Sequence, residues 1–378
     1  MLRSRKAIAT IALAAAVAVV APPVVAPAPA AASPAGFVLP APTGKHEVGR
    51  DVLHLVDRER RDQWVPERDR ELMVSMYYPA ASRKGRAAGY LTATEARLFL
   101  EMQGAAGAVD ADRLSATRGT ARTGAEPRRG RFPLVVLSPG FTLHRHTLTA
   151  LAEQLASRGY VVAAIDHAYE SAGSLFPGGR TLTCTACEVL DGATLEESAR
   201  LPLGRAGDVG LVLDRLGGWR HARMIDFTRI GMAGHSIGGN AAAATMAADR
   251  RVRAGINMDG TFVSPVAEGL DRPFLMLGTP PHAPGGRDYT WDRDYQKLGG
   301  WKRWLTVTGT GHLDFSDVAV IADQAGLADP ESPLPGDRTT AIVRTYVVAF
   351  FDRHLRGVAQ PLLDGPSAAY PEVMFHRP

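Results

Sequence analysis

Short apolar runs alternate with amphipathic patterns along most of this 378-residue chain, and this alternation constrains the fold more than any other feature. Runs of apolar or β-branched residues predict strands, whereas apolar residues spaced three and four apart predict helices. The predicted strands are 72–78, 134–137, 160–165, 229–233, 252–258, 274–277 and 304–307. The predicted helices are 94–103, 148–155, 209–216, 237–248 and 342–351. Strands that alternate with helices predict an α/β domain with a mostly parallel central sheet and helices on both faces.

Two stretches interrupt this alternation and are predicted to be insertions between core elements. Residues 82–131 are rich in Arg, Ala and Gly, and residues 168–205 are rich in Gly, Thr and Ser. Such insertions either form substrate-binding loops or only cover the surface. Four apolar residues of the first insertion either pack inward or make transient contact with a lipid surface: Leu98, Phe99, Leu100 and Met102.

The start of the chain has the pattern of a secretory signal peptide over residues 1–32. Three cations precede an apolar run from 7 to 20, and a Pro/Ala-rich stretch ends in small residues at Ala32. A membrane anchor is the alternative, but a spanning helix needs about 20 apolar residues and Pro22 interrupts the run. We therefore expect a secreted protein with a flexible segment over 33–44, a main domain over 45–357 and a C-terminal extension over 358–378.

Composition and charge exclude two broad classes of protein. With 46% hydrophobic residues, the chain can bury a large core and is not a disordered protein. The formal net charge of +4 falls to about +1 without the three cations of the predicted signal peptide. Because no long run of Lys and Arg follows, we expect no nucleic-acid partner.

The strongest chemical signal is the run Gly234-His235-Ser236-Ile237-Gly238, a G-x-S-x-G that follows a predicted strand and opens a predicted helix. In that setting the serine occupies a strained strand-to-helix turn that leaves its hydroxyl exposed. We therefore expect Ser236 to be a nucleophile. A neutral serine needs a base, and the base needs a carboxylate that orients it.

In α/β-hydrolases the nucleophile precedes the acid, and the acid precedes the base, so we expect both partners of Ser236 to follow it in the chain. His312 is the expected base because it follows the last predicted strand in a glycine-rich loop; the alternatives are His282, His354 and His376. Asp259 ends the strand after the nucleophile helix and is the expected acid, although an ordinary Asp-Gly turn would look the same. The residues alone leave Asp288, Asp292 and Asp294 open as alternatives.

Two backbone N–H groups are expected to stabilise the oxyanion of an acyl-transfer reaction. One belongs to Ile237, directly after the nucleophile. The other is assigned to Phe141, in the loop that follows the predicted strand 134–137, because Pro139 in the same loop has no N–H to donate.

The chain has two cysteines, Cys184 and Cys187, in a C-x-x-C within the second insertion. Two thiolates cannot supply a four-cysteine zinc site. In a secreted protein the expected state is a small disulfide that fixes the loop.

Taken together, these residues resemble the platelet-activating-factor acetylhydrolase family of α/β-hydrolases, in its plasma and type II forms. The resemblance is carried in order by 76–79, 135–141, 234–239, 256–259 and the run Gly309-Thr310-Gly311-His312 with its following Phe315-Ser316-Asp317. It implies the α/β-hydrolase fold, Asp259 as the acid beside Ser236 and His312, and oxyanion N–H groups from Phe141 and Ile237. The sequence departs from the family pattern at Pro139 and Thr142, in the oxyanion loop.

The resemblance implies a secreted serine ester hydrolase that acts on lipid-like or short-acyl esters, without a metal or other cofactor. A cutinase-like polyester hydrolase or a general esterase is an alternative within the same class, and the cutinase-like enzyme would usually take its acid from the loop after strand 274–277. A catalytically silent binding protein on the same scaffold is the alternative from another class. The expected partner is a small-molecule ester or lipid, and the sequence does not predict the oligomeric state.

Overall fold

The computed structural model describes residues 35–327 and 329–376. The predicted signal peptide lies outside these residues. Within the two ranges, no helix combines the length and the apolar character needed to cross a membrane.

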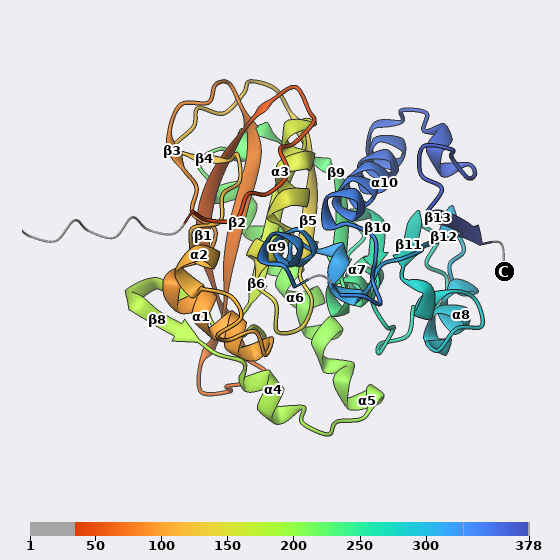
Figure 1. The fold of residues 1–378 in the computed structure, drawn as a ribbon, viewed down its shortest axis with the longest axis horizontal. Helices are drawn as coiled ribbons and strands as arrows, with labels where there is room; N and C mark the ends of the chain where they lie inside the picture. Colours follow the sequence, from red (N-terminus) through yellow and green to blue (C-terminus); the bar gives the residue numbers. More distant parts are fainter. Residues whose placement is uncertain (1–34, 328, 377–378) are drawn as a thin grey trace, which may run out of the picture. The chain divides into compact units, whose positions relative to one another are not determined.

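A large twisted sheet forms the centre of the described chain (Figure 1). In spatial order its eleven described strands are β13 (Val373–His376), β12 (Lys302–Val307), β11 (Phe274–Gly278), β10 (Val252–Met258), β9 (Ile225–His235), β5 (Phe132–Ser138), β6 (Val161–His167), β2 (Asp69–Ala80), β1 (Glu47–Arg61), β4 (Arg122–Thr123) and β3 (Arg86–Ala87). The run from β12 to β6 is parallel throughout, whereas β2 pairs antiparallel with both β6 and β1, and β13 pairs antiparallel with β12. The carboxyl ends of six parallel strands therefore meet at one edge of the sheet.

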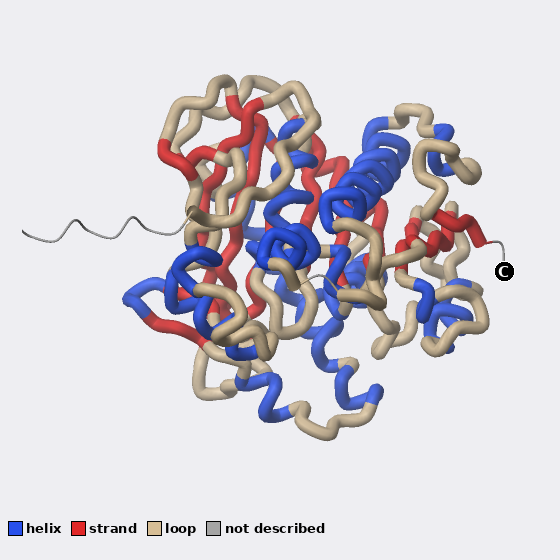
Figure 2. The backbone as a smooth tube through the Cα atoms, in the orientation of Figure 1, coloured by secondary structure: helices blue, strands red, loops and turns tan. Residues whose placement is uncertain are grey.

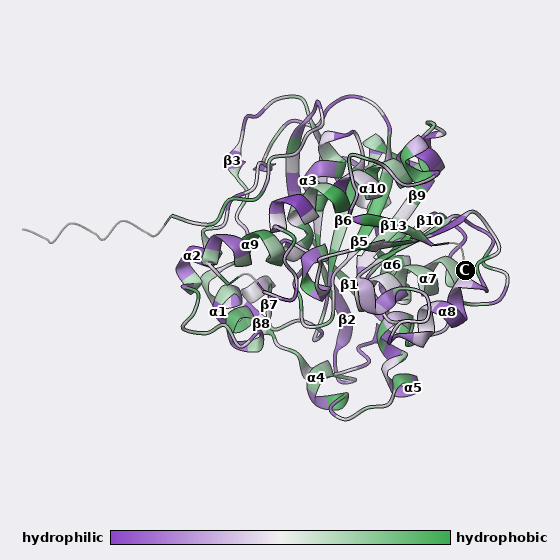
Figure 3. Cartoon of the chain, turned by 45° about the vertical axis from the view of Figure 1, so that its right-hand side comes forward, coloured by the Kyte–Doolittle hydropathy of each residue, from purple (hydrophilic) through white to green (hydrophobic). Residues whose placement is uncertain are grey.

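Helices cover both faces of this sheet (Figures 1 and 2). One face is covered by α3 (Thr149–Ser157) and α10 (Gly336–Arg356), and the other by α6 (Arg200–Arg215), α7 (Ile237–Ala248) and α8 (Tyr289–Tyr295). Strand β5 shows the consequence, because Val135 and Leu137 join the first core while Leu134 and Val136 join the second. The hydropathy colouring in Figure 3 shows the same apolar central strands. The predicted α/β-hydrolase fold is confirmed.

Both predicted insertions contain short elements of their own. The first holds β3, α1 (Ala93–Met102), α2 (Ala111–Ser115) and β4, and the second holds the hairpin β7 (Ser174–Phe176) and β8 (Arg180–Leu182) with α4 (Thr185–Val189) and α5 (Leu195–Ser198). The second insertion ends earlier than expected, because α6 already begins at Arg200. In α1, Phe99 and Leu100 pack inward and Met102 is exposed.

The two ends of the described chain differ from the sequence expectation. The segment 33–44 was expected to be flexible, but Phe37 and Leu39 are buried in an apolar cluster with α1 and α2. The extension after residue 357 contributes β13, whose backbone pairs with β12. Phe37 and Leu39 are held by the burial of their apolar side chains, and β13 is held by its hydrogen-bonded ladder with β12.

Candidate active site

Ser236 occupies the sharp turn between β9 and α7. Its backbone has φ 55° and ψ −128°, a conformation that is costly for a residue with a side chain. The flanking glycines allow the turn, because a Cβ on Gly234 would lie 2.0 Å from the carbonyl oxygen of Gly238. A Cβ on Gly238 would likewise lie 2.1 Å from the carbonyl oxygen of Ser138. The turn presents the Ser236 hydroxyl at the carboxyl edge of the sheet.

The structure brings together the three side chains that the sequence singled out. Ser236 Oγ lies 2.9 Å from His312 Nε2, and His312 Nδ1 lies 2.6 Å from Asp259 Oδ2. The imidazole of His312 is half exposed, whereas the Asp259 carboxylate is buried. This is the geometry of a nucleophile, a base and an orienting acid.

Asp259 is held in place by a second strained turn directly after β10. Its φ is 57°, and the side chain of Asn257 fixes the turn by hydrogen bonds with both the N–H and the carbonyl of Gly260. The backbone N–H and the hydroxyl of Thr279 donate to Asp259 Oδ1 at 2.6 and 2.7 Å. Burial alone would raise the pKa of this carboxyl group, but the hydrogen bonds from His282 and His312 hold it well below its ordinary value. Asp259 is therefore ionised.

The alternative acids and bases fall into two groups. Asp292 accepts from the N–H of Gly285, Asp294 accepts from the N–H of Val266, His354 lies against Trp301, and His376 contacts Thr306. None of these contacts involves Ser236 or His312. By contrast, His282 Nδ1 donates to Asp259 Oδ1 at 2.8 Å, and His282 Nε2 lies 3.0 Å from Asp288 Oδ2. The sequence analysis considered His282 and Asp288 as an alternative base and acid, but it did not predict that they lie behind Asp259.

His235, inside the serine motif, has a contact that sequence reasoning missed. It is fully buried, and its Nε2–H donates to the backbone carbonyl of His312 at 2.7 Å. Burial, with the neighbouring His312 as a second cause, lowers the pKa of His235 to about 3. A neutral His235 therefore anchors the loop that carries the base.

The loop Ser138–Phe141, after β5, lies against the start of α7. A Cβ on Gly140 would be 3.3 Å from the Cβ of Ser236, and the side chains of Phe141 and Ile237 join one apolar cluster. Thr142 follows with φ 67°, a conformation that favours glycine. Its N–H donates to the carbonyl of Glu170, and its own carbonyl accepts from Ala172. These backbone bonds hold Thr142 in the strained conformation.

A buried ion network contacts this loop, and no local sequence pattern predicts it. Arg205, on α6, donates to the carbonyl of Pro139 at 2.5 Å, to Ser138 Oγ at 3.2 Å and to Glu170 Oε2 at 2.8 Å. Arg70, on β2, donates to the other oxygen of Glu170 at 3.1 Å. Burial opposes the ionisation of Glu170, but Arg205 and Arg70 lower its pKa below the ordinary value. Glu170 thus contacts the loop on both sides, through Arg205 and through Thr142.

The same network continues to Asp208 on α6. Arg70 donates to both carboxylate oxygens of Asp208, at 3.0 and 2.6 Å, and to Asp62 at 2.8 Å. His167, at the end of β6, bridges Asp208 at 2.7 Å and Ser138 Oγ at 3.0 Å. Buried charges of both signs are therefore paired and hydrogen-bonded, as burial requires.

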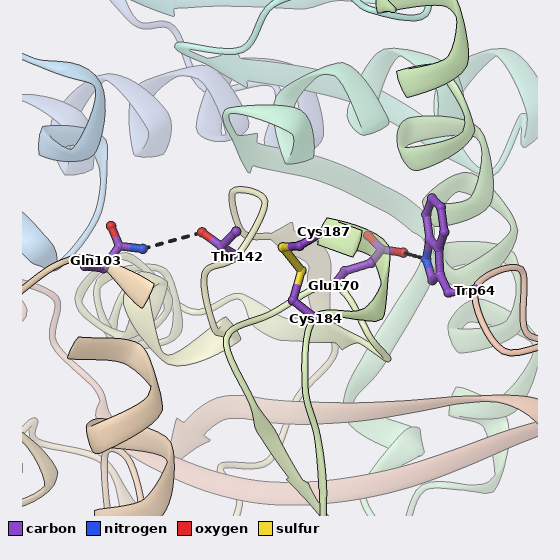
Figure 4. The surroundings of a disulfide bond; sticks show 6 residues. All are labelled: Trp64, Gln103, Thr142, Glu170, Cys184 and Cys187. Atoms are coloured by element: carbon purple, nitrogen blue, oxygen red, sulfur yellow. Dashed lines mark hydrogen bonds between the residues drawn. A yellow bond between two sulfur atoms is a disulfide. The ribbon is translucent and has the colours of Figure 1, made fainter. Parts of the chain in front are cut away.

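The predicted disulfide between Cys184 and Cys187 is present (Figure 4). Figure 4 shows it between Thr142, which contacts Gln103, and the hydrogen-bonded pair of Glu170 and Trp64. Both cysteines pack in the apolar cluster that contains Phe141 and Ile237. The disulfide therefore lies in the same apolar cluster as the side chains of the two expected oxyanion residues.

An apolar cavity of about 240 Å³ lies beside the base-carrying loop. It is lined by Tyr90, Leu91, Phe99, Leu100, Gln103, Ala105, Val109, Leu114, Thr147, Leu313, Val318, Ile321, Ala322, Ala325 and Leu327, from the first insertion, the residue after His312 and α9 (Val318–Ala325). A second hollow of about 320 Å³, lined by His312 itself, shares Leu313, Val318, Ala322 and Leu327 with it. An apolar cavity of about 150 Å³ already holds benzene, so this one has room for an aromatic ring or a short acyl chain.

Known proteins are similar to this chain in sequence and in fold. A family model described as platelet-activating factor acetylhydrolase, isoform II, matches residues 31–176. A probable 1-alkyl-2-acetylglycerophosphocholine esterase of Arthroderma benhamiae is 30% identical, over 90% of this chain and 94% of the relative. Platelet-activating factor acetylhydrolase of Gallus gallus is 22% identical over 60% of this chain and 62% of its own. The solved structure of a ferulic acid esterase from Streptomyces cinnamoneus aligns with a TM-score of 0.81 and 44% identity, over 91% of this chain and all of that one.

Proposed function

We propose that this chain, which belongs to the platelet-activating factor acetylhydrolase family and is a carboxylic ester hydrolase, hydrolyses esters through Ser236, His312 and Asp259. The observation that carries this proposal is the continuous contact from the Ser236 hydroxyl through the His312 imidazole to the ionised Asp259. The acid after β10, rather than one in the loop after β11, favours the family mechanism over the cutinase-like alternative.

The reaction begins when His312 Nε2 accepts the proton of Ser236 Oγ, which attacks the ester carbonyl. Asp259 keeps His312 in the tautomer with a proton on Nδ1 and stabilises the imidazolium that forms. The imidazolium then returns its proton to the leaving alcohol, and an acyl-enzyme remains on Ser236. Water activated by His312 releases the acid and restores the serine.

The tetrahedral oxyanion is assigned to the backbone N–H groups of Phe141 and Ile237. Ile237 is the first residue of α7, so its N–H has no partner within the helix. Phe141 comes from a loop that lies against the same helix start. Each such donor stabilises the transition state by about 3 kcal/mol.

The proposed substrate is a lipid-like or short-acyl ester, as the name of the Arthroderma benhamiae relative suggests. Esters of ferulic acid are the second candidate, favoured by the 44% identity to the Streptomyces cinnamoneus esterase over that whole chain. The apolar cavity beside Leu313 supports an apolar acyl group of either kind. We also propose that the protein is secreted, on the pattern of residues 1–32.

Kinetics of the Ser236→Ala variant test the proposal. We expect hydrolysis of p-nitrophenyl acetate to fall by about 10⁶-fold, with no labelling by a fluorophosphonate, because the nucleophile is absent. Unchanged hydrolysis would refute the mechanism, and wild-type protein that folds but resists labelling would favour the silent binding protein. A comparison of 1-alkyl-2-acetylglycerophosphocholine with methyl ferulate separates the two substrate classes by kcat/KM.

A further inference from the structure

His282 and Asp288 extend the line of contacts behind Asp259. His282 lies in the 3₁₀ turn Pro280–His282, just after β11, and only 8% of it is exposed. Its Nδ1 donates to Asp259 Oδ1, the oxygen that does not contact His312. Its Nε2 faces Asp288 Oδ2 at 3.0 Å. The chain of contacts thus runs from Ser236 through two histidines and two carboxylates.

The surroundings fix the His282 ring rather than merely accommodate it. Trp291 lies against it with ring centroids 4.7 Å apart, and Trp304 Nε1–H donates to the His282 carbonyl at 2.8 Å. A Cβ on Gly278 would lie 2.7 Å from the Trp291 ring and 3.2 Å from Asp259 Oδ1, so the glycine leaves room for this arrangement. Asp288 is itself oriented by the N–H and hydroxyl of Thr290, at 2.9 and 2.6 Å.

We propose that His282 is a positioning residue, whose imidazolium between Asp259 and Asp288 holds the Asp259 carboxylate with Oδ2 directed at His312. This inference rests on the proposed function of Ser236, His312 and Asp259. A carboxylate can rotate about its Cβ–Cγ bond, and donors on one oxygen fix the direction of the other. Thr279 and His282 both donate to Oδ1, which leaves Oδ2 for the base.

The charge state of His282 follows from the groups that face it. Among the described residues these are Asp259 from the end of β10 and Asp288 from the start of α8, whereas Trp291 and Trp304 present neutral rings. Burial alone would lower the pKa of His282, but its hydrogen bond to Asp259 and the nearby Asp288 carboxylate raise it to about 9. His282 is therefore an imidazolium at neutral pH and loses its proton above about pH 9.

Steady-state kinetics of four variants with p-nitrophenyl acetate, from about pH 6 to about pH 10, test this role. His282→Ala should lower kcat by about 100-fold with KM unchanged, because His282 orients the acid and does not touch substrate. His282→Asn should recover part of this loss, since its amide can replace the Nδ1–H but not the positive charge. Asp288→Asn should move the alkaline loss of kcat to lower pH, because one of the two carboxylates that raise the pKa of His282 is gone.

Asp292→Asn is the matched control, because Asp292 lies on the same helix and contacts Gly285 instead of His282. Its alkaline limb should coincide with that of the wild type. The inference would be overturned if all the His282 and Asp288 variants had the kcat and the pH profile of the wild type. It would also be overturned if His282→Asn recovered none of the kcat lost in His282→Ala and Asp288→Asn left the alkaline part of the pH profile unchanged. Should His282→Ala fail to fold in thermal melting, the other two variants still decide. If Ser236→Ala lost activity while the His282 variants kept the kcat of the wild type, the role of His282 would be refuted and the proposed function would stand.

Discussion

Backbone strain at single residues marks the candidate site. Among the described residues, the non-glycine residues with positive φ are Thr142, Tyr169, Ser236 and Asp259. Ser236 and Asp259 carry proposed catalytic side chains, Thr142 follows the oxyanion loop, and Tyr169 precedes Glu170, which holds that loop. Such conformations persist only where the surrounding contacts enforce them. The strain therefore lies where geometry matters to the proposed reaction.

At the residue scale, we predict that Asp259→Asn lowers kcat/KM by about 10⁴-fold, because an amide no longer holds His312 in the required tautomer. Asp292→Asn should leave kcat/KM within about twofold of the wild type. Steady-state hydrolysis of a p-nitrophenyl ester by both variants is the measurement. The reverse ranking would move the acid to α8 and restore the cutinase-like hypothesis.

The residues of the site could be predicted because each follows an apolar strand or begins a helix, which are local patterns. Ser236 and His312 each sit in a glycine-rich motif, and the resemblance to a family strengthened the choice of Asp259, which its place after a strand had already suggested. The residues alone left Asp259 and Asp288 as competitors, because spacing does not reveal which carboxylate reaches which histidine. The structure gives both a place, one beside His312 and one beside His282.

At the element scale, the ion network connects β2, α6 and the segment after β6 to the oxyanion loop. Arg70 and Glu170 are 100 residues apart in the chain, and Arg205 and Pro139 are 66 apart. No local pattern predicts such pairs, so the sequence could not reveal the network.

Strand β1 was missed for a related reason. Its many charges hide the strand pattern, and its pairing with the apolar β2 defines it.

We predict that Arg205→Met destabilises the protein by about 3 to 5 kcal/mol, because it leaves the buried Glu170 carboxylate short of one partner. The same variant should lower kcat, since the Pro139 carbonyl loses its donor. Arg215→Met is the matched control on the same helix: Arg215 is exposed, and the substitution should cost less than about 1 kcal/mol. Urea unfolding of the two variants measures the difference. Equal costs would show that the network does not support the loop.

At the scale of the whole molecule, buried carboxylates make stability depend on pH. Burial alone would raise the pKa of Asp208, but Arg70 and His167 hold it well below its ordinary value, and Glu170 is lowered in the same way. A carboxyl group with a depressed pKa in the folded state stabilises the fold above its unfolded pKa of about 4. That contribution is lost as pH falls through the lower pKa of the folded state.

We therefore predict that the free energy of unfolding falls steeply below about pH 5. Urea unfolding followed by circular dichroism at several pH values tests this. Asp208→Asn should be less stable at pH 7 and should show a shallower decline toward acid. Glu196→Gln, at an exposed position on α5, should follow the wild-type curve. A wild-type protein whose stability does not change between pH 7 and pH 3 would contradict the role assigned to the network.

The buried segment at the start of the described chain has a consequence for biosynthesis. The backbone of Val38 exchanges two hydrogen bonds with the side chain of Gln324, and Arg344 donates to the carbonyl of Pro40 at 2.7 Å. Pro40 therefore needs a partner that lies about 300 positions later in the chain, and so is synthesised much later. Because contacts between distant parts of a chain form slowly, we expect the segment around Val38 to dock late in folding. Chaperones that shield the early segment should accordingly raise the yield of active protein.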